Sequence, residues 1–339
     1  HLSIRRQREM CIRDSILTQL DNLNTFSGII NRTRRRDIGA FTVRRSETVE
    51  IEFTPQQRLL HDALLKVQAE IFMELHGSLH VKFMMTTIRR QAASCLFGLA
   101  PFIEDILSRY VSEEELSEVD LDEFDTDPDE LETIAEKVKV VVAMAKNLDP
   151  VDPKLDAVVS LVEQKQNSEE HDNHRVMLFS SFRHTLRYVH NGLLKAGIRA
   201  GMVHGGVPDE ERTALRERFE KDNVDPQAVD VLLFSEVGCE GLDYQFCDCM
   251  INYDLPWNPM RVEQRIGRID RNGQKSEFIS IYNLITPDTV DADIYERCLL
   301  RIGVFEQALG ESEEILGRIT RDIQQIAICL LYTSPSPRD

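Results

Sequence analysis

The feature that most constrains the fold is an alternation of short apolar segments and amphipathic helical segments after residue 175. Three of the apolar segments are Val176–Phe179, Val229–Phe234 and Cys249–Tyr253. Strands of this composition are buried on both faces, and the helical segments between them are long enough for parallel crossovers. The pattern predicts an α/β fold, in which a parallel sheet carries helices on both faces and binds ligands at the carboxyl ends of its strands. Further strands are predicted at 199–203 and 278–284, and helices at 183–196 and from residues 208, 259 and 288.

The chain before residue 175 is predicted to be mainly helical. The segment Thr42–Phe53 is an exception, because its alternating apolar and polar residues predict a half-buried strand. Thr54-Pro55-Gln56-Gln57 then combines a capping residue, a first-turn proline and a glutamine three residues past the cap, which marks a helix start. Helical periodicity continues to about Leu107, and Asp152-Pro153 begins another helix that extends to about Gln166.

The charge of the chain is unevenly distributed. The formal net charge is −18, and thirteen acidic residues with no lysine or arginine fall between Ser112 and Glu136. We interpret this run as a solvated linker, with a regulatory acidic arm as the alternative. No apolar run reaches membrane-spanning length, so the sequence predicts a cytoplasmic protein with no membrane partner. Cys247 and Cys249 lack a second cysteine pair, which favours buried free thiols over zinc binding.

Three loops that follow predicted strands carry residues suited to phosphate or nucleic-acid contact. Ser180-Ser181 offers hydroxyl groups to a nucleotide or a nucleic-acid backbone, or caps the next helix. The loop from Ser235-Glu236 to Asp243 contains two glycines, one of them Gly241, that permit close backbone approach, with a plain turn as the alternative. His204-Gly205-Gly206 ends a third strand, where the histidine is either structural or beside a nucleic-acid strand.

The segment Gln264–Arg271 reads Q-R-x-G-R-x-x-R and is predicted to be helical. Gln264, Arg268 and Arg271 are four and three residues apart, so they would line one face of that helix. Two guanidinium groups there, with Gly267 allowing close backbone approach, suit a polyphosphate whose charge shifts during a reaction. An exposed basic helix without a chemical role is the alternative.

In combination, these segments resemble the second RecA-like lobe of superfamily-two helicases. Ser180-Ser181 corresponds to motif IV, Ser235–Asp243 to motif V and Gln264–Arg271 to motif VI. The wording of motifs V and VI, with Asp254-Leu255-Pro256-Trp257-Asn258-Pro259 between them, is similar to the Swi/Snf-type ATPases and, within these, to the bacterial RapA/HepA-like branch. The similarity covers residues 25–305 and implies a prokaryotic protein.

The resemblance implies a role for each of these residues. Arg268 and Arg271 would be arginine fingers that reach the γ-phosphate of ATP, which is held with Mg²⁺ mainly by the other lobe. The ATP-binding residues around them would be Gln264, Gly241, Asp243 and Gly267. The residues facing a nucleic acid, expected to be double-stranded DNA, would be Ser180, Ser181, His204, Gly205, Gly206, Ser235 and Glu236. ATP would close the two lobes and hydrolysis would reopen them, and this cycle would move the protein along a strand.

The first lobe of that family is not found in the sequence. Because no G-x-x-x-x-G-K-[ST] loop and no DExH box occur, the chain is predicted to be one half of an ATP-dependent DNA translocase and inactive alone as an ATPase. The missing lobe would be its partner in cis, and RNA polymerase or a defence-system complex are open as further partners. The alternatives are an RNA helicase lobe, or a module that binds nucleic acid or protein without catalysis. A dinucleotide-dependent dehydrogenase is disfavoured, because no G-x-G-x-x-G follows a first strand.

The two ends of the chain differ in character from the rest. Residues 1–15 and 329–339 resemble translated sequencing adapters, and we expect them to be unstructured or poorly packed. Between them, the predicted domains are the tail of the first lobe with the joining segment at 16–53, a helical region at 54–110, an acidic linker and helix at 111–150, the RecA-like lobe at 151–310 and a C-terminal helix at 311–328.

Overall fold

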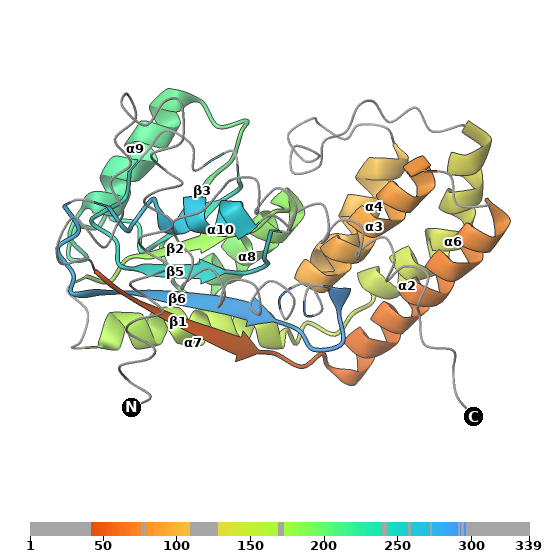
Figure 1. Cartoon of the computed structure of the whole chain (residues 1–339), viewed down its shortest axis with the longest axis horizontal. Helices are drawn as coiled ribbons and strands as arrows, with labels where there is room; N and C mark the ends of the chain where they lie inside the picture. Colours follow the sequence, from red (N-terminus) through yellow and green to blue (C-terminus); the bar gives the residue numbers. More distant parts are fainter. Residues whose placement is uncertain are drawn as a thin grey trace, which may run out of the picture. The chain divides into compact units, whose positions relative to one another are not determined.

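A parallel β-sheet with helices packed against it forms one part of the protein (Figure 1). The computed structural model describes residues 42–75, 79–108, 128–168, 173–236, 238, 243–256, 259–271, 273–290, 292 and 295. Within these residues the sheet has six strands in the order β1-β6-β5-β2-β4-β3, and every neighbouring pair is parallel. The strands are β1 (Val43–Glu50), β2 (Val176–Phe179), β3 (Ala200–Val203), β4 (Val231–Phe234), β5 (Cys249–Asn252) and β6 (Phe278–Ile285). The predicted parallel α/β sheet is therefore confirmed. The predictions for both chain ends, for residues 311–328 and for most of the acidic run lie outside the described residues.

Successive residues of the central strands pack against different helices. Met177 and Phe179 of β2 belong to one core with residues of α9 (Asp209–Glu220) and α10 (Pro259–Ile266). Val176 and Leu178 belong to a second core with residues of α7 (Pro153–Asn167) and α8 (Arg183–Lys195). Because side chains alternate between the faces of a strand, the two cores lie on opposite faces of the sheet. This explains the nearly continuous apolar runs, since each fully buried large side chain contributes roughly 1.5–3 kcal/mol.

Strand β1 joins the sheet at its edge. It pairs in parallel with β6 over eight residues, from Val43 opposite Phe278 to Glu50 opposite Ile285. The strand predicted within Thr42–Phe53 is thus confirmed, but most of its side chains are exposed rather than half-buried. The sequence predicts that this segment belongs to the joining region before the lobe at 151–310. In the structure it is a strand of that lobe's sheet. Backbone hydrogen bonds to β6 hold the strand, and a side-chain pattern does not reveal them.

The helical region has a core of its own. It comprises α2 (Pro55–Glu74), α3 (Leu79–Ser94), the short 3₁₀ helix η2 (Leu96–Gly98), α4 (Leu99–Leu107) and α6 (Pro128–Lys146). Leu64, Met84, Ile103 and Val141 are among its fully buried side chains. The predicted helix start is confirmed, because the Thr54 hydroxyl accepts from the Gln57 amide and the Gln57 side chain accepts from the Thr54 amide. The last helix of this region, α6, contains the final acidic residues of the predicted linker.

The buried histidine of this region makes the stability of the protein sensitive to acid. His61 is 1% exposed, and burial together with the nearby Arg89 and Arg58 lowers its pKa to about 4. The unfolded chain binds a proton near pH 6.5 and the folded chain only near pH 4, so stability is complete above pH 6.5 and falls as the pH decreases toward 4. We expect His61 to account for about 3 kcal/mol of this loss. Urea unfolding at pH 8 and pH 5 should show that His61→Leu loses less stability than the wild type between these pH values. An equal loss in both proteins would contradict the assignment.

The described cysteines and helices bear on two further predictions, one about buried thiols and one about membrane spans. Cys95, Cys247 and Cys249 are free and buried, which confirms the prediction of buried thiols for the last two. Burial raises the pKa of Cys247 to about 12, so its thiol remains protonated at neutral pH. Within the described ranges, no helix is both long and apolar enough to cross a lipid bilayer.

Candidate nucleotide and nucleic-acid site

The loops at the carboxyl ends of neighbouring strands are held together by backbone hydrogen bonds. The Ser180 amide donates to the Phe234 carbonyl at 3.1 Å, and the Ser235 amide donates to the Val203 carbonyl at 3.1 Å. These bonds continue the pairing of β2 with β4 and of β4 with β3 beyond the strand ends. The residues predicted from motifs IV and V therefore share one edge of the sheet, as a parallel sheet requires.

Asp254 is the centre of this edge. Its carboxylate is 2% exposed and accepts hydrogen bonds from the Ser180 hydroxyl at 2.5 Å, the Ser181 amide at 2.8 Å and the Ser94 hydroxyl at 2.6 Å. Ser180 is fully buried and its hydroxyl is used by Asp254, whereas Ser181 is partly exposed and contributes only its backbone amide to this contact. The sequence resemblance predicts no role for Asp254. An acidic residue two positions after the end of a buried strand was the signal that could have identified it.

Arg265 connects this edge to α10. Its side chain is 0% exposed, and its guanidinium donates to the Asn252 side chain at 3.0 Å and to the Asp254 carbonyl at 3.1 Å. It also forms an ion pair with Glu236, and it lies over the Phe179 ring at 5.2 Å. Glu236, predicted to face nucleic acid, is thus paired inside the protein, with its side chain 11% exposed. The contacts of Arg265 stabilise the loop after β4 against α10.

The predicted helix through Arg271 is shorter than expected. Helix α10 ends at Ile266, and residues 267–271 form a series of turns, so the prediction of a helical face that carries Arg268 and Arg271 is wrong. The amides of Arg268 and Ile269 each donate to the carbonyl three residues earlier, which tightens the chain after the helix. Gly267 accounts for the early end, since glycine weakens a helix by about 1 kcal/mol relative to alanine.

The turn after α10 nevertheless brings two predicted site residues together. Arg271 forms an ion pair with Asp243 at 2.5 Å, and both side chains are nearly half exposed. The Arg271 guanidinium also donates to the Gly267 carbonyl at 3.1 Å. Arg268 is partly buried, and its Nε atom has no hydrogen-bond partner among the described residues. Gln264 is exposed at the start of this surface, whereas Gly241 lies outside the described residues.

The loop after β3 is fixed by internal contacts. The His204 ring accepts from the Gly206 amide at 3.1 Å. Arg212 on α9 donates to the carbonyls of His204 and Gly205 at 3.1 and 2.9 Å. His204 and Gly205 are partly exposed and Gly206 is exposed, so this loop presents backbone to solvent.

Gly238 lets the loop after β4 pack against the end of β3. Its amide donates to the Ser235 hydroxyl at 3.2 Å, and a Cβ atom at this position would lie 2.2 Å from the Val203 carbonyl oxygen. Ser235, predicted to face nucleic acid, is 9% exposed. Its hydroxyl therefore has a structural partner in this state.

Gly238→Ala is expected to destabilise the protein by about 1–3 kcal/mol, because the backbone must shift to admit the methyl group. Urea unfolding would measure the effect. Gly201→Ala is the matched control, since a Cβ there would meet only the ends of leucine and valine side chains, none nearer than 3.0 Å. Equal losses for the two variants would contradict a specific requirement for glycine at position 238.

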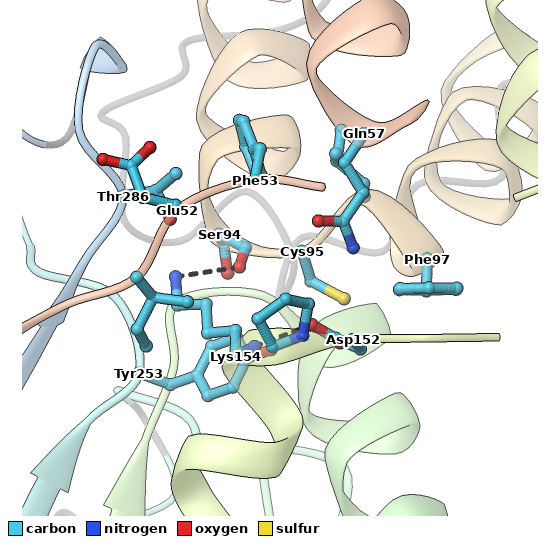
Figure 2. A pocket seen from close by; sticks show the side chains of 13 residues that line it. Glu52, Phe53, Gln57, Ser94, Cys95, Phe97, Asp152, Lys154, Tyr253 and Thr286 are labelled. Atoms are coloured by element: carbon cyan, nitrogen blue, oxygen red, sulfur yellow. Dashed lines mark hydrogen bonds between the residues drawn. The ribbon is translucent and has the colours of Figure 1, made fainter. Parts of the chain in front are cut away.

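The helical region meets this edge of the sheet around Ser94, at the end of α3. Figure 2 shows Lys154 directed toward Ser94. The Lys154 ammonium group donates to the Ser94 carbonyl at 3.0 Å. The ammonium also donates to the Ala93 carbonyl at 3.3 Å and lies 4.6 Å from the Tyr253 ring. A buried cation at the C-terminus of a helix is favourable, because the last carbonyls carry partial negative charge. Lys154 and Ser94 thus bind the helical region to the strands that position Asp254.

A magnesium site would need several oxygen ligands in one place. Among the described residues, no group of three or more His, Cys, Asp or Glu side chains is arranged to hold a metal ion. The described part of the chain therefore offers arginines for a phosphate but no carboxylate cluster for its metal.

Residues 153–273 match the family of the helicase conserved C-terminal domain. The chain is 29% identical over 315 residues to a Bacillus subtilis protein described as the uncharacterized ATP-dependent helicase YqhH, covering 92% of this chain and 50% of the relative. It is 30% identical over 193 residues to the Arabidopsis thaliana protein CHROMATIN REMODELING 24, covering 57% of this chain and 17% of the relative. The chain thus spans half or less of the length of these relatives.

A solved structure has the same fold. The C-terminal part of the Fun30 ATPase domain superposes with a TM-score of 0.51 at 15% identity, covering 84% of this chain and 98% of that one. Because this similarity covers 84% of the chain, it extends beyond the family match at residues 153–273 into part of the helical region.

Proposed function

We propose that this chain, whose residues 153–273 match the helicase conserved C-terminal domain, is the C-terminal RecA-like lobe of a superfamily-two, Snf-type helicase and supplies one half of an ATPase site. The turn at 267–271 would present Arg268 and Arg271 to the γ-phosphate of an ATP molecule bound by another lobe. The ion pair between Arg271 and Asp243 is the observation that carries this proposal, because it places a guanidinium and a carboxylate side by side at the surface.

Two properties of this pair suit a nucleotide. Both side chains are nearly half exposed, and exposed ion pairs contribute only about 0–1 kcal/mol. Arg271 can therefore exchange its carboxylate partner for a phosphate at little cost, and Asp243 is then free to accept a hydrogen bond from a ribose. Arg268 is partly buried, and its Nε is enclosed without a hydrogen-bond partner among the described residues, so the side chain would have to turn outward for this atom to reach an anion.

ATP would be bound by Gln264, Gly241, Asp243 and Gly267 in addition to the two arginines. Gly267 is partly exposed, and its carbonyl accepts from the Arg271 guanidinium, so its backbone lies beside this arginine. Mg²⁺ would be held mainly by the other lobe.

The nucleic acid in this proposal is double-stranded DNA. The exposed backbone of the His204–Gly206 loop supports contact with phosphates. Ser180 and Ser235 are buried and Glu236 is nearly so, so these residues would act mainly by shaping the loops that approach the strand. Ser181 combines both properties: its amide donates to Asp254 inside the protein, and the residue is partly exposed to solvent.

The chain by itself is expected to release no phosphate from ATP above background, because arginine fingers accelerate hydrolysis only of a nucleotide that is already held with its metal. Phosphate release by the purified 339-residue chain should be compared with that of a two-lobed protein in which a phosphate-binding lobe precedes it. Each would be assayed with no nucleic acid, duplex DNA, single strands and RNA. Stimulation of the two-lobed protein by duplex DNA supports the proposal. Robust hydrolysis by the chain alone would contradict it. Stimulation by RNA only would mean that RNA, and not DNA, is the nucleic acid on which the protein acts.

A further inference from the structure

Arg44 on the edge strand β1 bonds one residue before the turn at residues 267–271, called the finger turn below, and one residue within it. Its Nε donates to the Asp270 carboxylate at 2.6 Å. Its Nη1 donates to both oxygens of Glu263, at 3.1 and 2.9 Å. Glu263 lies in the last turn of α10, and Asp270 lies between Arg268 and Arg271 in sequence. One guanidinium therefore ties together the two ends of the segment that contains Gly267 and Arg268.

The burial of Asp270 makes its contact with Arg44 more than a surface ion pair, whereas Glu263 is 41% exposed. The Asp270 side chain is 3% exposed and the Arg44 side chain 24% exposed. Burial lowers the pKa of Arg44, but Glu263 and Asp270 more than offset this, so the pKa lies above its ordinary value. Hydrogen bonds between charged groups with little solvent are stronger and more directional than exposed ones. Loss of Arg44 would leave Asp270 as a buried carboxylate deprived of this contact.

The finger turn needs such a contact, because regular secondary structure does not hold it. Helix α10 stops at Ile266, and the amides of Arg268 and Ile269 make only short-range turn bonds. A guanidinium that bonds Glu263 before the turn and Asp270 within it restricts the path of the chain between them. The contact could not be inferred from sequence spacing, since Arg44 is 219 residues from Glu263 and 226 from Asp270.

We propose that Arg44 is a positioning residue of the ATPase site and couples the edge strand β1 to the arginine-finger turn. The inference rests on the function proposed above. In this arrangement the register of β1 on β6 determines where Arg44 lies, and Arg44 determines where the turn that carries Arg268 and Arg271 lies.

Strand β1 is suited to such a role. It is held through backbone pairing with β6, and most of its side chains are exposed. Apart from Arg44, the anchor nearest its start is Arg45, whose guanidinium lies 3.5 Å from the centre of the Phe278 ring. Arg45 is thus the matched control: it is the next residue on the same strand, carries the same charge, and contacts the sheet through Phe278.

The test uses Arg44→Ala, Arg44→Lys, Asp270→Asn and Arg45→Ala in a two-lobed protein that contains this chain. For Arg44→Ala we expect kcat to fall about 10- to 100-fold through misplacement of the fingers, with KM for ATP changed much less. Arg44→Lys should recover part of kcat, because an ammonium retains one charged contact but not the two-sided geometry. Arg45→Ala should retain kcat. In hydrogen–deuterium exchange of the 339-residue chain, Arg44→Ala should accelerate exchange in residues 267–271 and leave β4 and β5 unchanged.

Arg268→Ala, assayed in parallel, separates the two levels of the proposal. Normal ATP hydrolysis by Arg268→Ala would contradict the proposed function itself. If Arg268→Ala is inactive while Arg44→Ala keeps full kcat, only the role of Arg44 is overturned. An equal loss in Arg45→Ala would also overturn it, because the effect would then belong to the strand and not to the contact. If Arg44→Ala does not fold, Asp270→Asn removes one side of the contact without loss of volume, and an unchanged kcat there overturns the inference.

Discussion

Arg268→Ala is expected to lower ATP hydrolysis by roughly 10³-fold or more in a two-lobed protein that contains this chain. Arg268 follows Gly267 in the turn after α10, and its Nε has no partner among the described residues. Its guanidinium would stabilise negative charge that develops on the γ-phosphate and is absent from bound ATP in the ground state. The loss should therefore appear in kcat, and duplex DNA binding should be largely retained.

Steady-state phosphate release at saturating duplex DNA, combined with fluorescence anisotropy of labelled DNA, would measure both quantities. Arg187→Ala is a suitable control, since it removes an exposed arginine from α8, whose core lies on the opposite face of the sheet from that of α10. Hydrolysis by Arg268→Ala at the wild-type rate would refute the finger assignment. Loss of DNA binding in parallel with hydrolysis would instead indicate that Arg268 contributes to the nucleic-acid surface.

Arg265→Met is expected to lower the free energy of unfolding by about 3–5 kcal/mol, because it leaves one partner of a buried ion pair without compensation. Arg265 is fully buried and bonds Asn252, the Asp254 carbonyl and Glu236. Its removal would free the loop after β4 from α10 and leave the Glu236 carboxylate unpaired at 11% exposure. Urea unfolding of the 339-residue chain at neutral pH would measure the change.

The double variant Arg265→Met with Glu236→Gln provides the control. Because it removes both charges, part of the lost stability should return, so the two single changes should not add. Strict additivity would show that the pair contributes little and that Arg265 acts through its other hydrogen bonds. Comparison with Arg268→Ala, which should cost far less stability, distinguishes a residue that builds the site from one that acts in it.

The sequence predicted the fold well because the pattern of strands in a parallel sheet is local. Val176–Phe179 was predicted and observed at the same bounds, and the predicted helix from residue 183 is α8. The capping signal at Thr54 was also correct, since it involves only four consecutive residues. The prediction failed for the helix through Arg271, where arginine spacing suggested a continuous face. Gly267 and the tight turn bonds that follow it end the helix at Ile266.

The candidate site was predicted in its parts but not in its connections. The motif order predicted that Asp243 and Arg271 share one surface. In the structure, an Nη atom of Arg271 lies 2.5 Å from a carboxylate oxygen of Asp243. Ser180 and Glu236 were read as surface contacts, whereas the structure pairs them with Asp254 and Arg265. A motif indicates which residues gather in one place. It does not distinguish a side chain that faces a ligand from one that holds the loop beneath it.

The sequence by itself determined the parallel sheet, its two covering layers of helices and the residues that meet at its carboxyl edge, because hydrophobic periodicity and motif order are written along the chain. The tertiary structure alone decided that β1 extends this sheet, that Asp254 and Arg265 form its polar centre, and that Arg44 reaches the finger turn. The reason is physical. These contacts join residues between 11 and 226 positions apart, and buried ion pairs form only where folding brings matched charges together out of water.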